Sequence, residues 1–516
     1  MALVENYLLG MDCGTTNIKA VILGEDGERV AEASRPNRFL SPGPGMQEQS
    51  AEQWWGEAVS IFRELARSAG REVTARIRAI CISSHTVSLL PVDAEGRPLR
   101  NAMTYQDGRS SKELGAVVSR LGFDHYVQIT GAQPAVAFLP GKLLWYKEHE
   151  PDLFARTDCF LQASSYINFR LTGVRSSDID QATRTQCLNM KTLEWSDEMS
   201  AALGIDLNEY LPMPVLTDEI IGTVTRTAAE ETGLCEGTPV LAGCSDAMAA
   251  MLATGMSQIG EAGESSGTSS LVFIGSRTKS ALDIPVVTRP CPIDGMPWIF
   301  DAPISTTGAA LRWYIQKFCE KEQADCEAAG KNIYTYLNET ALDAPAGSNG
   351  LYFFPYLLGE RAPIWSGHAR GMFIGMGMEM TKADLTRSVF EGTAYALRHV
   401  IETVKESGGE CSSLRVCGGG AKSRTWSMIK ASMLQCPVKV LDEKSGDVPI
   451  GDALLAGHKA GVFPSLTDAV KKIVKVSEVI EPNPQWAETY DRLYPYYIRF
   501  YQDLDKDLKE RYGRPL

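Results

Sequence analysis

The sequence lacks the features that mark membrane-spanning, zinc-binding and disulfide-rich proteins. It contains no apolar run near the roughly 20 residues that a bilayer-spanning helix needs. Its six histidines include no pair four residues apart, and its twelve cysteines include no C-x-x-C pair, so the common zinc-site spacings are absent. The first residues show no charged segment followed by an apolar one, which is the pattern of a secretory signal. We therefore expect a cytoplasmic protein whose cysteines stay reduced.

An excess of positive charge is also absent. The chain has 51 Lys and Arg residues against 64 Asp and Glu residues, which gives a formal net charge of -13. Nucleic acids are held mainly by clustered Lys and Arg, so we expect no nucleic acid as partner. The lack of a bilayer-spanning run argues against a membrane. An anionic ligand must then be bound by a local group of donors. The sequence leaves a homodimer open.

The length of the chain predicts two domains. Its 516 residues exceed what one hydrophobic core normally supports, because domains of about 100–250 residues are the usual units. Its composition, with 44% hydrophobic and 22% charged residues, is that of an ordinary globular protein. We expect the domains to cover residues 1–254 and 255–516.

Two helices carry clear start signals. Ser50 followed by Gln53, and Thr381 followed by Asp384, have the spacing of a capping box. After Thr381, apolar residues keep a 3.6-residue spacing as far as Val404. This pattern predicts a long helix in the core of the second domain.

Three short turns combine glycine with hydroxyl residues next to predicted strands. They are formed by Gly14, Thr15 and Thr16, by Gly267, Thr268 and Ser269, and by residues 418–423. Glycine lets backbone N–H groups approach a phosphate, and Ser or Thr adds donors. One such turn could equally be a plain β-turn. Three of them, with the first pattern recurring after residue 255, favour a duplicated phosphate-binding protein.

Nucleotide-binding motifs of other folds are absent. No G-x-x-x-x-G-K-[ST] segment occurs, which argues against a P-loop, and the glycines at 418–420 are too few for a dinucleotide fingerprint. Two phosphate-binding hairpins followed by a third glycine turn are typical of the actin-like scaffold. We therefore predict an α/β fold of the two-lobed, actin-like type, a duplicated ribonuclease-H-type ATPase fold with a cleft between its lobes.

Longer segments resemble the FGGY family of carbohydrate kinases along nearly the whole chain. The segment over 11–19 is similar to the family's first phosphate motif, and the segments over 371–376 and 384–391 fit its C-terminal signature position for position. Segments over 47–55 and 106–109 look most like the xylulokinases within the family. The chain departs from the family pattern at Ser84, Tyr105, Leu139 and Ala247, and these departures cluster in the expected sugar pocket.

The resemblance implies two aspartates with chemical roles. Asp246, which ends a predicted strand and begins a helix of small residues, would be the catalytic base that takes the proton of the sugar hydroxyl. A helix cap is its alternative role. Asp12 would hold Mg²⁺, because the ion needs a carboxylate beside the phosphates. An aspartate that only caps its turn is the alternative there.

The resemblance also implies two sets of binding residues. The expected ATP-binding residues are Asp12, Gly14, Thr15, Thr16, Lys19, Gly267, Thr268, Ser269, Gly308, Gly418, Gly419, Gly420, Ala421 and Ser423. The expected sugar-binding residues are Ser84, His85, Tyr105, Gln106 and Asp246. Lys19 could equally be an exposed strand lysine, and His85 could equally be structural.

These inferences together predict an ATP-dependent sugar kinase. The first domain would bind the sugar and carry the first phosphate motif, and the second would bind ATP. The acceptor expected first is D-xylulose, with D-xylulose 5-phosphate as product. Another ketose, a polyol such as glycerol and an aldonate such as gluconate stay open as acceptors. A non-catalytic sensing or assembly protein on the same actin-like fold is the remaining alternative.

Overall fold

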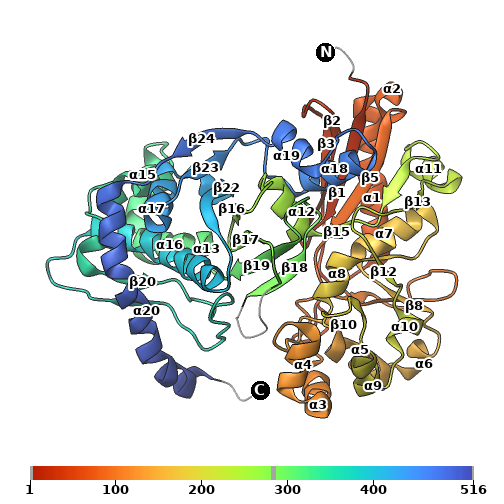
Figure 1. The fold of residues 1–516 in the computed structure, drawn as a ribbon, viewed down its shortest axis with the longest axis horizontal. Helices are drawn as coiled ribbons and strands as arrows, with labels where there is room; N and C mark the ends of the chain where they lie inside the picture. Colours follow the sequence, from red (N-terminus) through yellow and green to blue (C-terminus); the bar gives the residue numbers. More distant parts are fainter. Residues whose placement is uncertain (1–3, 280–285, 514–516) are drawn as a thin grey trace. The chain divides into compact units, whose positions relative to one another are not determined.

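The computed structural model describes residues 4–279 and 286–513, which fall into two compact units (Figure 1). Unit 1 comprises Met1–Ala253 and Asp447–Ile473, and unit 2 comprises Thr254–Gly446 and Val474–Leu516. The division expected from the sequence was continuous, whereas in the structure residues 447–473 return to unit 1. No helix within the described ranges is long and apolar enough to cross a membrane. All twelve cysteines are free thiols.

Unit 1 is built on a large mixed sheet with helices packed against it. Its strands are β1 (Tyr7–Cys13), β2 (Asn17–Gly24), β3 (Arg29–Pro36), β4 (Glu48–Gln49), β5 (Ile77–Ser84), β6 (Leu90–Val92), β7 (Ala102–Met103), β8 (Cys159–Leu161), β9 (Ser177–Asp178), β10 (Leu188–Asn189), β11 (Glu194–Trp195), β12 (Pro214–Val215), β13 (Ile220–Thr223), β14 (Pro239–Leu241) and β15 (Cys244–Ser245). Its helices are α1 (Ala51–Ala69), α2 (Arg71–Thr74), α3 (Ser111–Leu121), α4 (Phe123–Thr130), α5 (Leu139–His149), α6 (Pro151–Phe154), α7 (Ala163–Thr172), α8 (Ile179–Arg184), α9 (Asp197–Leu203), α10 (Leu207–Tyr210), α11 (Arg226–Thr232), α12 (Asp246–Ala253), α18 (Val448–Lys459) and α19 (Leu466–Ile473).

Unit 2 has the same kind of architecture. Its strands are β16 (Gly260–Ser266), β17 (Ser270–Ser276), β18 (Val287–Pro290), β19 (Trp298–Ile304), β20 (Tyr352–Phe354), β21 (Met372–Ile374), β22 (Cys411–Cys417), β23 (Val438–Leu441) and β24 (Val476–Ile480). Its helices are α13 (Gly308–Phe318), α14 (Glu320–Ala328), α15 (Ile333–Leu342), η1 (Ser348–Gly350), α16 (Lys382–Glu406), η2 (Gly419–Lys422), α17 (Arg424–Leu434) and α20 (Pro484–Tyr512).

The two large sheets repeat one topology. In unit 1 the order is β13-β14-β5-β1-β2-β3, and in unit 2 the strands β24-β23-β22-β16-β17-β19 follow in the same sequence. The strand directions also correspond, because β1 runs antiparallel to β2 and parallel to β5, as β16 does with β17 and β22. The duplication expected from the recurring glycine turns is therefore present.

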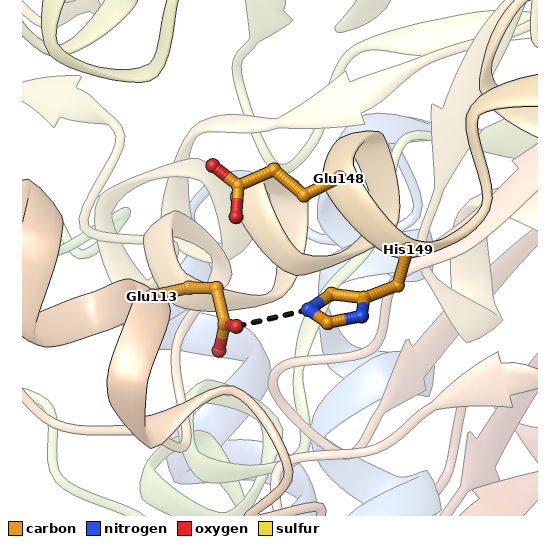
Figure 2. Close-up of side chains that lie close together, drawn as sticks. All are labelled: Glu113, Glu148 and His149. Atoms are coloured by element: carbon orange, nitrogen blue, oxygen red, sulfur yellow. Dashed lines mark hydrogen bonds and ion pairs between the residues drawn. The ribbon is translucent and has the colours of Figure 1, made fainter.

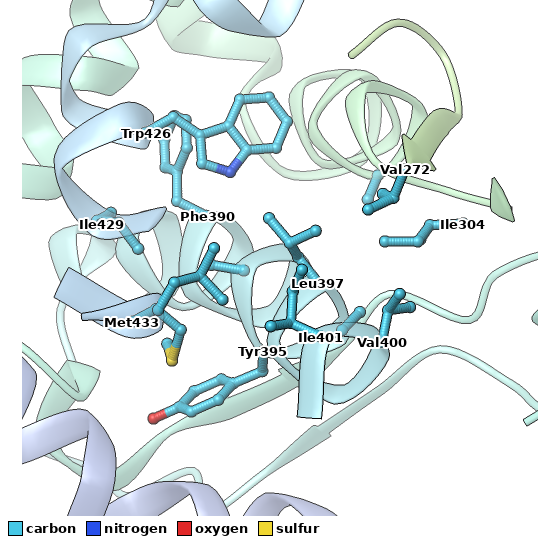
Figure 3. Close-up of a cluster of buried hydrophobic side chains, with 14 of the residues drawn as sticks. Val272, Ile304, Phe390, Tyr395, Leu397, Val400, Ile401, Trp426, Ile429 and Met433 are labelled. Carbon is cyan, nitrogen blue, oxygen red and sulfur yellow. The ribbon is translucent and has the colours of Figure 1, made fainter. Parts of the chain in front are cut away.

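The start signals read from the sequence are confirmed. Ser50 caps α1 by accepting a hydrogen bond from the backbone N–H of Gln53. Thr381 and Asp384 form a capping box at the start of α16. Figure 3 shows the core that α16 enters, where Phe390 and Leu397 lie among buried residues from β17, β19 and α17.

The returning helix α18 packs very closely on unit 1, where it appears blue beside the red strands in Figure 1. A Cβ atom on Gly10 of β1 would lie 1.9 Å from the carbonyl oxygen of Pro449, and one on Gly451 would lie 1.9 Å from that of Ala249. Only glycine permits backbones to approach so closely. This approach attaches α18 to β1 and α12, and so assigns residues 447–473 to unit 1.

Candidate active site

Asp12 lies near the end of β1 in unit 1 and is only 7% exposed. Its Oδ1 atom is buried and has no hydrogen-bond partner among the described residues. Burial raises the pKa of Asp12 well above its usual value, the nearby Asp246 carboxylate raises it further, and Lys19 opposes both effects. An unsatisfied buried carboxylate is costly, so this group is suited to receive a cation.

Asp246 begins α12, directly after β15, and its side chain is partly buried. The end of β5 pairs with the end of β1 on one side and with the end of β15 on the other, so Asp12 and Asp246 lie at the same edge of the sheet. The Asp246 carboxylate accordingly raises the pKa of Asp12. Lys19 stands opposite Asp12 in the register of β1 and β2, and its Nζ atom lies 3.5 Å from Oδ1 of Asp447. The structure thus brings Asp12, Lys19 and Asp246 together.

The first glycine turn contacts Tyr105, which in turn contacts two other predicted sugar-binding residues. The hydroxyl oxygens of Thr15 and Tyr105 lie 3.3 Å apart, and Nε2 of Gln106 donates to the Tyr105 hydroxyl at 3.1 Å. The centroid of the Tyr105 ring also lies 6.4 Å from the centroid of the His85 ring. These polar groups form one connected set beside the turn.

His85 is 1% exposed and sits at the end of β5. Burial lowers its pKa to about 4, so the ring is neutral at physiological pH. Its Nδ1 atom lies 3.0 Å from the carbonyl oxygen of Cys13, which requires the hydrogen on Nδ1. The Nε2 atom is then an acceptor, and it has no partner in the described part of the chain.

The hydroxyl of Ser84 is engaged in hydrogen bonds within the protein. Ser84 is fully buried, and its hydroxyl donates to Oγ of Ser164 at 3.0 Å while accepting from Nε2 of Gln181 at 2.9 Å. Both hydrogen bonds serve the protein interior. A sugar-binding role for Ser84 therefore stays a prediction.

The glycine turns expected to bind the nucleotide converge within unit 2. The N–H of Gly308 donates to the carbonyl of Gly267 at 3.1 Å, and a Cβ atom on Gly308 would lie 2.4 Å from that oxygen. Gly418 and Gly420 both pack against Ser266, the last residue of β16. Gly267, Thr268, Gly418 and Gly419 are exposed. The N–H of Gly267 is engaged within its own turn, because it donates to the carbonyl of Ser269 at 2.9 Å.

The remaining predicted residues lie in or beside these turns. Gly14 follows β1, and its carbonyl accepts from Nδ2 of Asn37 at 2.8 Å. Thr16 is exposed, Ser269 is partly exposed and Ala421 lies in η2. Ser423 is the N-cap of α17 and also donates to Oδ1 of Asn338 at 2.6 Å, so its hydroxyl is engaged within the protein.

Family models match both units of the chain. The N-terminal domain of the FGGY family of carbohydrate kinases matches residues 7–253, and its C-terminal domain matches residues 264–460. The chain belongs to the FGGY family of carbohydrate kinases. Its reaction is therefore the ATP-dependent phosphorylation of a carbohydrate hydroxyl.

Several relatives of this FGGY kinase match over nearly their whole length. A xylulose kinase from Bacillus subtilis is 28% identical, with 98% of this chain and 99% of that protein covered. A gluconokinase from the same organism is 27% identical, with 97% of each chain covered. The crystal structure of a xylulose kinase from Rhodospirillum rubrum superposes with a TM-score of 0.88 at 29% identity, covering 98% of this chain and 100% of that one.

Sequence reasoning missed a buried ion pair below the second glycine turn of the kinase. Glu264 of β16 is 1% exposed, and its carboxylate accepts from Nζ of Lys430 and from Oγ of Ser270, each at 2.7 Å. The two charged residues are 166 positions apart. No local pattern connects residues that distant.

Sequence reasoning also missed α8, which lies beside the ends of β5 and β15. Its N-cap is Asp178, which accepts from the N–H of Gln181 at 2.8 Å. An aspartate followed three residues later by glutamine is a helix-start signal, so this helix could have been found. The contacts that the buried side chains of Asp180 and Gln181 make could not have been predicted, because their partners are distant in the sequence.

One group of three side chains in the described residues is close enough to hold a metal ion (Figure 2). It consists of Glu113, Glu148 and His149, from α3 and α5, and Nε2 of His149 lies 3.1 Å from Oε1 of Glu113. Glu148 and His149 are exposed. The group does not include Asp12, and it corresponds to none of the predicted site residues.

Proposed function

We propose that this FGGY kinase phosphorylates D-xylulose to D-xylulose 5-phosphate with Mg²⁺ and ATP. The observation that carries the proposal is the partly buried Asp246 beside the buried Asp12, at the ends of two strands of one sheet. Similarity to xylulose kinases over nearly the full chain supports the choice of sugar. Unit 1 would hold the sugar and unit 2 the nucleotide.

Asp246 would act as the catalytic base. Phosphoryl transfer to an alcohol needs a group that accepts the hydroxyl proton as the oxygen attacks. Asp246 is partly exposed at the start of a helix, so a ligand can reach it. Tyr105 and Gln106 would bind the sugar hydroxyls, and the free Nε2 of His85 would accept a hydrogen bond from one of them.

Asp12 would hold the magnesium ion. Its orphaned Oδ1 atom and raised pKa indicate a carboxylate that gains from a nearby cation. Mg²⁺ usually keeps several waters and binds through one or two carboxylates and substrate phosphates, so water and phosphate oxygens would supply the other ligands. Bound Mg²⁺ would neutralise charge on the phosphates during transfer.

The exposed turns would bind ATP mainly through backbone groups. In unit 1, Gly14, Thr15 and Thr16 would contact phosphate groups of ATP. In unit 2, Gly267, Thr268 and Ser269 would also contact phosphate groups. Gly308, Ala421 and Ser423, with the glycines at 418–420, would contact the rest of the nucleotide. Lys19 would add positive charge, although its pairing with Asp447 shares that charge.

The test is ADP formation with Mg·ATP against a panel of acceptors. We expect D-xylulose to stimulate ADP formation above the acceptor-free rate, with the phosphorylated product identified by ³¹P NMR. Gluconate is the second candidate, because a gluconokinase matches the chain almost as completely as the xylulose kinases do. Stimulation by gluconate or glycerol alone would replace the proposed acceptor. No stimulation by any member of the panel would contradict the kinase proposal.

A further inference from the structure

Helix α8 connects the two strand ends that present the candidate sugar-binding and catalytic residues. It has six residues, and every residue after Ile179 is buried. On one side it contacts the end of β5, where Ser84 precedes His85, and on the other it contacts the end of β15, where Ser245 precedes Asp246. A helix so short has little stability of its own, so these contacts must hold it in place.

Asp180 makes the contacts to the end of β15. It is fully buried, and its Oδ2 atom accepts hydrogen bonds from both the N–H, at 3.0 Å, and the hydroxyl of Ser245. Its Oδ1 atom accepts from Nε of Arg184, one helical turn later, at 3.1 Å. The charged carboxylate is thus satisfied on both oxygens, as a buried charge must be.

Ser245 transmits this constraint to α12. Its Oγ atom accepts from the N–H of Met248 at 3.1 Å, so the same hydroxyl that donates to Asp180 also caps the first turn of the helix. Asp246 is the first residue of that helix. The position of its carboxylate therefore depends on a chain of hydrogen bonds that ends at Asp180.

Gln181 makes the corresponding contacts to the end of β5. Its Nε2 atom donates to Oγ of Ser84 at 2.9 Å, and its Oε1 atom accepts from the hydroxyl of Thr86 at 2.6 Å. His85 lies between these two residues in the chain. The ends of β5 and β15 are also paired directly in the sheet, with Ser245 opposite Ser84. Two adjacent residues of α8 therefore add side-chain hydrogen bonds to both strand ends.

We propose that Asp180 is a positioning residue for phosphoryl transfer, which acts through Ser245 to orient Asp246. The inference rests on the proposed role of Asp246 as the base. A base that accepts a proton in the transition state must be held in a narrow range of positions, and a misplacement of about 1 Å costs on the order of 100-fold in rate. Asp180 restricts the turn before Asp246 without itself touching the sugar.

The test compares Asp180→Asn with the wild type in steady-state kinetics. We expect kcat for sugar-dependent ADP formation to fall by about 10- to 100-fold, while KM for ATP stays within about twofold. The folded fraction of each variant is measured by circular dichroism, and rates are expressed per folded molecule. A loss that disappears after this correction would overturn the proposal.

Asp178→Asn is the matched control. It is the same substitution two positions earlier, at a buried residue of which the pKa is raised by burial and by Asp180, and asparagine is as good an N-cap as aspartate. We expect its kinetics to match the wild type. An equal fall in kcat for both variants would show a general disturbance of α8 and would overturn a specific role for Asp180.

A double-mutant cycle with Ser245→Ala tests the route to Asp246. If Asp180 acts through Ser245, the double variant should be no slower than the slower single variant. Independent, multiplying losses would overturn this route. Failure of the inference is distinguishable from failure of the proposed function. If Asp246→Asn is inactive while Asp180→Asn is fully active, only the positioning role is wrong; if Asp246→Asn is active, the base assignment itself is wrong.

Discussion

The two large sheets share one topology but treat their buried carboxylates in opposite ways. In unit 1, Asp12 lies near the end of β1 and has an oxygen without a hydrogen-bond partner among the described residues. Burial and Asp246 raise its pKa. In unit 2, Glu264 in the matching strand β16 is neutralised by Lys430 and bonded by Ser270. The two units thus share a similar backbone topology, but the charged groups around their buried carboxylates differ.

This difference separates structural from reactive carboxylates. A buried charge with a complete set of partners stabilises one arrangement and offers nothing to a ligand. A buried carboxylate without partners is costly until a cation or proton reaches it. We therefore propose that the cation and proton chemistry belongs to the strand ends of unit 1, and that the glycine turns of unit 2 bind the nucleotide mainly through backbone groups.

The largest expected effect is at Asp246, the proposed catalytic base in unit 1. Asp246→Asn should lower kcat for sugar-dependent ADP formation by about 10²–10⁴-fold, because the amide cannot accept the hydroxyl proton. The control is Asp197→Asn, at an exposed position at the start of α9, which should leave kcat unchanged. A coupled ADP assay measures both variants. Near-wild-type turnover of Asp246→Asn would contradict the assignment of Asp246 as the base.

Breaking the ion pair in unit 2 should affect stability rather than chemistry. Lys430→Met leaves the Glu264 carboxylate buried without its cation, and we expect the free energy of unfolding to fall by about 3–5 kcal/mol. Adding Glu264→Gln should recover part of this loss. Lys422→Met removes a surface pair with Glu443 and should cost under about 1 kcal/mol. Urea unfolding measures all three, and equal losses for Lys430 and Lys422 would contradict the comparison.

Replacing Asp12 should stabilise the ligand-free protein, whereas replacing Lys430 should destabilise it. The pKa of Asp12 is raised above 3.8 in the folded state, so the folded protein binds this proton more tightly than the unfolded chain does. Stability from this group is full below about pH 3.8 and is lost as the pH rises through the folded pKa. Asp12→Asn should therefore stabilise the ligand-free protein at pH 8, by about 1–3 kcal/mol, and less at pH 5. Urea unfolding at several pH values would contradict this if the difference grew as the pH fell.

The smallest expected effect is at Lys19. Lys19 and Asp447 are 44% and 38% exposed, and exposed pairs contribute about 0–1 kcal/mol to stability. Lys19→Met should change the free energy of unfolding by less than about 1 kcal/mol. If the charge also helps to bind phosphate, KM for ATP should rise by no more than about fivefold, the equivalent of about 1 kcal/mol. A larger rise would make Lys19 a principal phosphate ligand.

Much of the fold could be predicted because its signals are local. The caps at Ser50 and Thr381, the hairpin at Gly14 and the repeated turn at Gly267 each depend on a few neighbouring residues. These short signals were enough to predict the duplication. They specify individual elements, and they do not specify which elements pack together.

The remaining features depend on contacts between distant residues. Helix α18 joins unit 1 because Gly10 and Gly451 permit close backbone approach. The residues next to each glycine in the sequence do not indicate this packing. The hydrogen bonds of the Ser84 hydroxyl with Ser164 and Gln181 also join residues far apart in the sequence, and the sugar-binding role of Ser84 stays a prediction. The positioning role proposed for Asp180 was not predicted, because it depends on a hydrogen bond with Ser245, which is 65 residues away.

The most direct test of the comparison is the Mg²⁺ dependence of ADP formation in two variants measured together. Asp12→Asn should raise the Mg²⁺ concentration for half-maximal activity by about 10- to 100-fold, as expected when a carboxylate near a metal is lost. The paired variant Glu264→Gln with Lys430→Met should keep it within about twofold of the wild type. Equal shifts in the two variants, or a shift only in the second, would contradict the assignment of the cation to unit 1.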